Sequence, residues 1–145
     1  MKRLIVSFAF VVVFAAAAAP AFAQQSGSLR IEFQGPGGHS SGAYGRVSAL
    51  HAAARAVMLI QQALPMGSYQ ITNLTGGNSV NAIASDGLVE LKLTAGSAAA
   101  YQALVTAVTK AATEGAAAEN AFRGVKAGDL TAGAPATVRV TVKPV

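Results

Sequence analysis

Two glycine-rich runs carry the polar side chains with the greatest chemical reach in this chain. The first, GPGGHSS, covers residues 35–41 and presents His39, and the second, TGGNSVNAIA, covers residues 75–84 and presents Asn81. A histidine on a tight turn can donate a hydrogen bond to an anionic oxygen or act as an acid–base group. An asparagine amide can bind a carboxylate or a carbonyl oxygen. Both residues are therefore candidates for contact with a substrate.

The same residue types also support a plainer interpretation. The first run could merely join a strand to a helix, with His39 solvated, and Asn81 could bond only to neighbouring backbone groups. Gly76 and Gly77, which precede Asn81, commonly mark a turn or a bulge. Residue type alone leaves both interpretations open.

The other reactive side chains do not assemble into a catalytic site. Hydrolytic zinc sites use about three protein ligands, whereas the chain offers two histidines, His39 and His51, and six scattered carboxylates. It contains no H-x-D or H-E-x-x-H sequence, no paired glutamates, no serine in a nucleophile-elbow pattern and no phosphate-loop spacing. It also contains no cysteine. We therefore expect no metal site, no cofactor and no complete enzyme in this chain.

The first 23 residues have the pattern of a signal peptide. Lys2 and Arg3 precede an apolar run from Leu4 to Ala19, and Ala21-Phe22-Ala23 forms an A-x-A cleavage site before Gln24. A transmembrane helix is the alternative, but an apolar run that stops at Pro20 is short for a bilayer, which needs about 20 residues. We expect a secreted protein of the bacterial periplasm whose mature domain covers residues 24–145.

The charge of the mature domain gives little support to nucleic-acid binding. Without Lys2 and Arg3, nine basic residues remain against six acidic ones, and the net charge falls from +5 to +3. The basic residues are scattered, with no run and little aromatic interleaving. We therefore expect no nucleic acid as a partner. No later segment of the sequence is apolar enough to span a bilayer, so we also expect no membrane contact once the leader is removed.

Hydrophobic periodicity predicts six elements in the order β-α-β-β-α-β. Alternation of apolar and polar residues predicts the first and the last strand. Apolar residues at helical spacing predict two helices, and alanine-rich tracts in them allow close packing on the sheet. The order fits an α+β, ferredoxin-like sandwich, in which two helices cover one face of a four-stranded antiparallel sheet. The predicted elements are strand 28–34, a helix from Tyr44 or Gly45 to Leu64, strands 68–74 and 88–94, a helix from Ala98 to about Thr113 that could extend to Phe122, and strand 137–142.

The first helix should have one apolar and one polar face. We expect His51 and Arg55, one turn apart, to form part of the polar face or of an interface. The expected apolar stripe is Val47, Leu50, Ala54, Val57 and Leu64, and the expected polar face is Ser48, His51, Arg55 and Gln62.

Together, the two glycine-rich runs resemble the signatures of a known domain. GPGGHSS followed by a helix is similar to the strand–GxxxHSS–helix signature of the peptidase dimerisation (lid) domain in metallopeptidase family twenty, and GGNSVNAIA is similar to that domain's G-G-x-x-x-N-x-I-P. This family includes zinc-dependent aminoacylases, carboxypeptidases and dipeptidases. The resemblance extends over nearly all of the mature chain. Nothing in the chain matches the zinc-binding catalytic domain.

The resemblance implies roles for specific residues. It implies a homodimer formed through an edge strand and the first helix, with His39 reaching a partner's active site to polarise the substrate carbonyl. It implies that Asn81, with Gly76 and Gly77, contacts substrate. The zinc ions would come from a separate catalytic chain. Three positions depart from the family pattern: Ala84 replaces a proline, and Lys92 and Thr94 stand where the family often has Asp-x-Arg.

These expectations lead to several hypotheses about function. The first is a secreted, stand-alone dimerisation domain that is not catalytic by itself and that associates with itself or with a partner. The second is an accessory lid subunit of a split zinc hydrolase. The third is a module that binds a small acyl-amino acid or peptide at the two glycine-rich loops. A remnant of a larger hydrolase is the remaining alternative.

Overall fold

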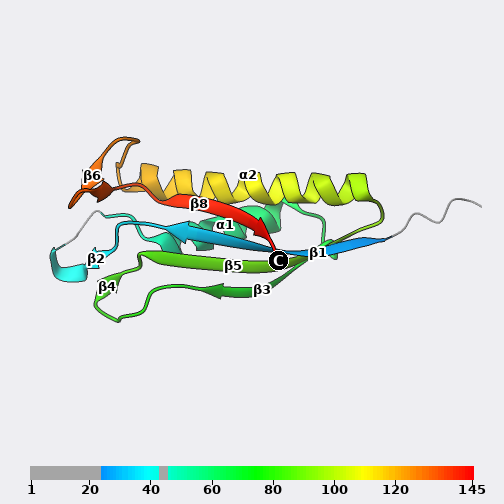
Figure 1. Ribbon diagram of the computed structural model, residues 1–145, viewed down its shortest axis with the longest axis horizontal. Coiled ribbons are helices and arrows are strands. Elements are labelled where there is room, and N and C mark those ends of the chain that lie inside the picture. The colour runs from blue at the N-terminus through cyan, green and yellow to red at the C-terminus, as the bar shows by residue number, and fades with distance from the viewer. Residues whose placement is uncertain (1–23, 43–45) are drawn as a thin grey trace, which may run out of the picture.

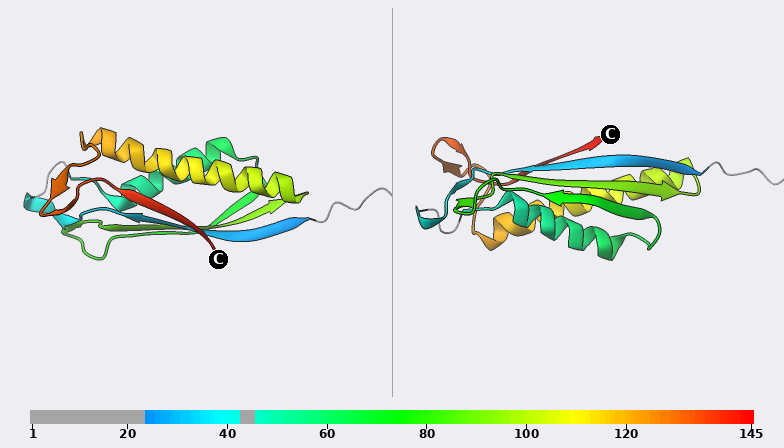
Figure 2. Two further views of the ribbon diagram at one scale, coloured as in Figure 1. Left: turned by 45° about the horizontal axis from the view of Figure 1, so that its top comes forward. Right: turned by 90° about the horizontal axis from the view of Figure 1, so that it is seen from below.

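The computed structural model describes residues 24–42 and 46–145, which form two layers. Four antiparallel strands make the sheet in the order β3-β5-β1-β8 (Figure 1). Both helices cover the same face of this sheet (Figure 2). The long elements are β1 (Gln25–Gln34), α1 (Ala49–Ala63), β3 (Tyr69–Thr75), β5 (Asp86–Ala95), α2 (Ala98–Phe122) and β8 (Arg139–Pro144). This arrangement confirms the predicted α+β, ferredoxin-like βαββαβ sandwich.

The sheet alternates as the sequence predicts. Leu29, Ile31 and Phe33 of β1 face the helices and are buried, while Arg30 and Glu32 lie on the open face and pair there. Strand β1 is central and is paired with β5 along its whole length and with β8 from Leu29 onward. Strands β3 and β8 are the two edges of the sheet, and β3 contains a bulge between Ile71 and Asn73.

The buried face of α1 differs from the predicted stripe. Ala49, Ala52, Ala53, Ala56 and Ile60 are buried. In the predicted stripe, the residues that lie within the helix, Leu50, Ala54 and Val57, are only partly buried. Val47 and Leu64 are buried, but they lie just outside the two ends of the helix. Small side chains face inward because α2 approaches α1 closely there.

Gly115 of α2 marks this close approach. A Cβ atom at Gly115 would lie 2.7 Å from the backbone nitrogen of Ala56 and 2.9 Å from the carbonyl oxygen of Ala52. Only a residue without a Cβ fits against backbone at that distance. The helices therefore pack backbone to backbone, which is why alanine rather than larger aliphatic residues covers the buried side of α1.

Helix α1 begins later than predicted, at Ala49. The reason is Ser48, whose hydroxyl accepts a hydrogen bond from the backbone N–H of His51 and so caps the helix. Ser48 is therefore buried at the helix start and is not part of an exposed polar face. The predicted starts Tyr44 and Gly45 lie outside the described residues, as does the predicted signal peptide. Helix α2 extends to Phe122, the longer of the two predicted ends.

Two small antiparallel ladders add to the main sheet, and neither is predicted from the sequence. Strand β2 (Gly38–His39) pairs with β4 (Ala82–Ile83), and β6 (Leu130–Thr131) pairs with β7 (Ala134–Pro135). The 3₁₀ turn η1 (Ser40–Gly42) follows β2. Among the described helices, none is both long enough and apolar enough to cross a membrane.

Candidate functional site

The β2–β4 ladder brings the two glycine-rich runs together. His39 is paired with Ala82 in this ladder, so Asn81 lies beside the histidine ring although 42 residues separate them. The Asn81 amide nitrogen is 3.3 Å from His39 Nε2. Both side chains are exposed at the end of the sheet where β2 and β4 lie. The two residues singled out from the sequence thus form one polar pair.

The hydrogen bonds around His39 define its tautomer. The backbone N–H of Ser41 can only donate, so its 3.2 Å contact makes Nδ1 an acceptor, and Ser41 Oγ lies 2.7 Å from the same nitrogen. A neutral ring then carries its proton on Nε2. A half-rotation of the Asn81 amide lets its oxygen accept that proton while its nitrogen faces Ser79 Oγ. His39 therefore presents an N–H donor at the surface.

Gly76 and Gly77 have a backbone role in the same region. A Cβ at Gly76 would lie 2.5 Å from the carbonyl oxygen of Asp86, and Gly77 has a φ of +73°. The end of β3 could not approach β5 and then turn away with larger residues at these positions. These glycines also line the pocket described below, whereas neither His39 nor Asn81 lines it.

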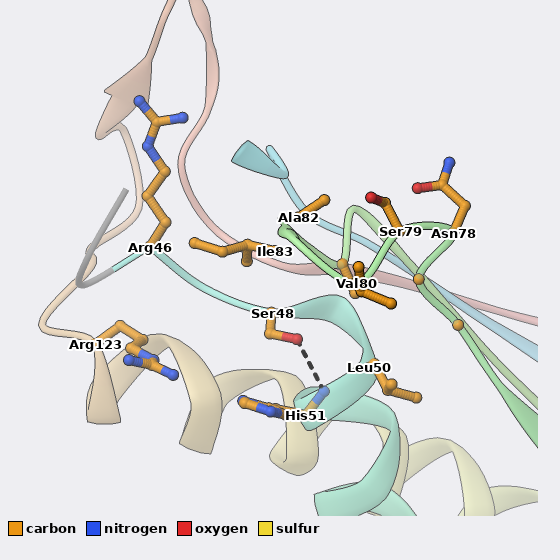
Figure 3. Close-up of a pocket in the computed structure, with 13 residues that line it drawn as sticks. Arg46, Ser48, Leu50, His51, Asn78, Ser79, Val80, Ala82, Ile83 and Arg123 are labelled. Carbon is orange, nitrogen blue, oxygen red and sulfur yellow. Dashed lines mark hydrogen bonds between the residues drawn. The ribbon is translucent and has the colours of Figure 1, made fainter. Parts of the chain in front are cut away.

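A pocket of about 640 Å³ lies between the β3–β4 loop, the start of α1 and the end of α2. Its charged and polar side chains include Arg46, Ser48, His51 and Arg123 (Figure 3). Its apolar side chains are Leu50, Val80 and Ile83, together with small residues of the loop. In Figure 3 the side chains of His51 and Arg123 point toward one another below Ile83.

Glu119, a fully buried carboxylate, lies beside this pocket and holds several of its residues in place. Its Oε1 accepts hydrogen bonds from the backbone N–H of Ser48 at 3.1 Å and from Arg123 Nε at 3.3 Å. Its Oε2 accepts one from Arg55 Nε at 3.1 Å. His51 Nδ1 lies 3.7 Å from Oε1. One carboxylate thus ties the start of α1 to the end of α2.

Sequence reasoning missed this cluster. By spacing in the sequence, Glu119 is one of six scattered carboxylates. His51 and Arg55 are predicted to share a helix face, but no common partner is predicted for them. The one available signal is a glutamate among small residues at the inward positions Ala112, Gly115 and Ala116 of α2. An acidic residue on a buried helix face requires partners. The sequence does not say which ones, because they come from α1. Within the described residues, no group of three or more His, Cys, Asp or Glu could hold a metal ion.

Solved structures with the same fold include segments of longer proteins. The chain matches an aminobenzoyl-glutamate utilization protein from Klebsiella pneumoniae (17% identity, TM-score 0.66, covering 83% of this chain and 28% of that one). It matches a hydantoinase/carbamoylase family amidase from Burkholderia ambifaria (20%, 0.66, 86% and 28%) and a tripeptidase from Staphylococcus aureus (18%, 0.61, 83% and 29%). No curated protein matches the sequence. The chain therefore spans less than a third of the length of these structural relatives.

The fold and the paired runs define a two-layer α+β domain with two glycine-rich runs side by side at one end of its sheet. The family model described as the peptidase dimerisation domain matches residues 24–120, which is most of the chain. The chain belongs to this peptidase dimerisation domain family. The match covers the dimerisation domain alone and includes no catalytic domain.

Proposed function

We propose that the chain is an exported, stand-alone dimerisation module, not catalytic by itself, that pairs with a second copy through β3 and α1. Membership of the dimerisation family supports self-association, and the leader-like residues 1–23 support export. An edge strand supports pairing because its outer N–H and C=O groups have no neighbour in the sheet.

The observation that carries the proposal is the contrast between the two edges. Strand β8 contains Arg139, Lys143 and Pro144, the residue types that discourage edge-to-edge pairing. Strand β3, with the sequence YQITNLT, contains no charge and no proline. The β3 edge is therefore the one whose composition permits a second strand to add.

Helix α1 extends the same surface. It is the helix that contacts β3, whereas α2 contacts β8. Met58 on α1 has 59% of its surface exposed, and Leu74 near the end of β3 has 43% exposed. A second copy that paired along β3 would bury apolar surface of this kind, which favours association.

Light scattering coupled to gel filtration tests the proposal. We expect the purified chain to elute as a dimer. Lysine at both Gln70 and Leu74, two exposed positions of β3, should give a monomer because like charges would face each other across the two-fold pairing. Thr141→Lys, at an exposed position of β8, is the matched control and should remain dimeric. A monomeric parent chain at high concentration would contradict the proposal.

The His39–Asn81 pair favours a second candidate function, an accessory lid for a zinc hydrolase encoded as a separate chain. The exposed Nε2 proton is positioned to donate to a substrate carbonyl oxygen brought by that partner. Since a ligand oxygen could replace the Asn81 amide as its acceptor, the pair supports binding in trans. The zinc and the general base would come from the partner.

Reconstitution with a lid-less zinc domain from a neighbouring reading frame tests this second candidate. Addition of the chain should raise the hydrolysis rate, and His39→Ala should remove about 10²-fold of that gain in kcat, as expected for loss of one oxyanion donor. Glu114→Ala, an exposed change on α2, is the control for folding. Unchanged activity with His39→Ala would contradict a catalytic contribution.

A further inference from the structure

The pocket lined by Arg46, His51 and Arg123 has a surplus of positive charge. Glu119 carries one negative charge beside it and is bonded to two guanidinium groups, those of Arg55 and Arg123. One positive charge is therefore left over. Arg46 on the rim adds another, and its single hydrogen bond within the described chain is to a neutral acceptor, the carbonyl oxygen of Gly37. The lining contains no acidic side chain.

Donors in the pocket remain available for a ligand. Arg123 uses Nε on Glu119, and no hydrogen bond within residues 24–42 and 46–145 uses its two Nη atoms. Ser48, only 6% exposed, accepts from the N–H of His51, and its hydroxyl proton has no acceptor in the described part of the chain. His51 lies at the opening, with 60% of its side chain exposed. The guanidinium group of Arg123 and the imidazole ring of His51 point toward the same space (Figure 3).

The opposite wall of the pocket is apolar. Val80 from the β3–β4 loop, Ile83 from β4 and Leu50 from α1 line the pocket beside the donors. A volume of about 640 Å³ falls within the usual range for small-molecule sites. A bare inorganic anion would use the donors but leave this apolar wall in water, so the wall favours an organic anion.

We propose that this pocket binds a small organic carboxylate with an apolar body. The carboxylate accepts hydrogen bonds from Arg123, Ser48 and His51, and the body packs against Ile83 and Val80. Arginine suits this role because its planar fork matches the two oxygens of a carboxylate. Neither His39 nor Asn81 nor any residue of β3 lines this pocket, so its ligand binding is tested independently of the function proposed above.

Amide NMR titration with benzoate tests the proposal, with benzamide and inorganic phosphate as comparison probes. Benzoate should shift the amide signals of Leu50, His51 and Gly77 saturably. Benzamide, which lacks the charge, and phosphate, which lacks the apolar body, should bind at least about tenfold more weakly. Equal binding of benzamide would overturn the role of charge, and equal binding of phosphate would overturn the role of the apolar wall.

Variants locate the site. Arg123→Gln is combined with Glu119→Gln, because loss of the guanidinium alone would leave a buried carboxylate short of a partner. We expect this pair of changes to weaken benzoate binding about tenfold. His51→Gln, at an exposed position, should weaken it in the same direction and serves if the double variant does not fold. Arg139→Gln on β8 is the control and should leave affinity unchanged. Parent-like affinity in the folded pocket variants would overturn the proposal.

Discussion

At the scale of single residues, the described part of the fold holds one buried charged side chain, that of Glu119. Glu119 is fully buried, and its oxygens accept from Arg55, Arg123 and the backbone N–H of Ser48. Buried charges persist only when such partners satisfy them. The cluster therefore converts a costly residue into a link between the two helices.

Glu119→Ala should destabilise the domain by about 2–3 kcal/mol, since it leaves the Ser48 N–H and two guanidinium groups without their acceptor. The expected loss of stability is at the lower end of the range for breaking a buried ion pair. The reason is that both arginines are partly exposed and can form hydrogen bonds to water instead. Urea unfolding followed by circular dichroism measures the change. Glu114→Ala is the control on the same helix. It removes only the exposed pair with Lys110 and should cost less than about 0.5 kcal/mol.

Glu32, on the open face of the sheet, predicts a dependence of stability on pH. A hydrogen bond from Lys143, at 2.7 Å, and a second from Arg30 hold the pKa of this carboxyl below its ordinary value of 4.5. A lowered pKa in the folded state stabilises the fold above the unfolded-state pKa, and the gain disappears as the pH falls through the folded-state value. Glu32→Gln should therefore lower the urea midpoint near neutral pH.

The same variant should match the parent chain in acid. Urea midpoints of the two proteins, measured from about pH 7 down to about pH 2.5, should converge once Glu32 is protonated in both states of the parent. A constant difference across this range would show that Glu32 contributes by packing and not by charge. Screening by salt should also reduce the neutral-pH difference, because the residue is exposed.

At the scale of elements, the distance between α1 and α2 is short because Gly115, at their contact, has no side chain. Gly115 allows the backbone of Ala52 and Ala56 to approach α2, and this approach in turn places Glu119, one turn further along, beside Ser48 and Arg55. The pocket at the end of the helices therefore depends on a glycine in the C-terminal part of α2.

Gly115→Ala should destabilise the domain by about 1–2 kcal/mol. Alanine favours a helix over glycine by roughly 1 kcal/mol, but the new Cβ would lie 2.7 Å from backbone that cannot move alone, and overpacking of this kind costs about 1–3 kcal/mol. Thermal unfolding measures which effect is larger. Gly96→Ala is the matched control, since its Cβ would meet no atom within 4 Å, and it should leave stability unchanged or slightly raised.

At the scale of the whole molecule, association should be visible in stability. The proposed pairing along β3 couples folding to a second copy, so mass action makes the melting temperature depend on protein concentration. Between about 1 and 100 µM, the melting temperature of the parent chain should rise by a few degrees. The variant with lysine at Gln70 and Leu74 should melt at one temperature throughout. A parent chain with a concentration-independent melting temperature would count against the dimer.

Local patterns along the chain are enough to predict the layers of this protein. Alternation at Leu29, Ile31 and Phe33 and the helical periods of the two long segments each depend on neighbours along the chain, so the α+β sandwich could be predicted. The resemblance to the dimerisation family could be recognised from the sequence for the same reason, because each of its two signatures is a short, continuous run of residues. The family match confirms it.

Which polar groups meet depends on contacts between segments that lie far apart in the chain. The β2–β4 ladder places Asn81 against His39, and the close packing at Gly115 brings Arg55 and Ser48 to Glu119. These contacts join residues that lie between 42 and 71 positions apart. Periodicity records whether a residue faces inward, but it does not record which distant residue it faces, because that depends on how closely two backbones can approach.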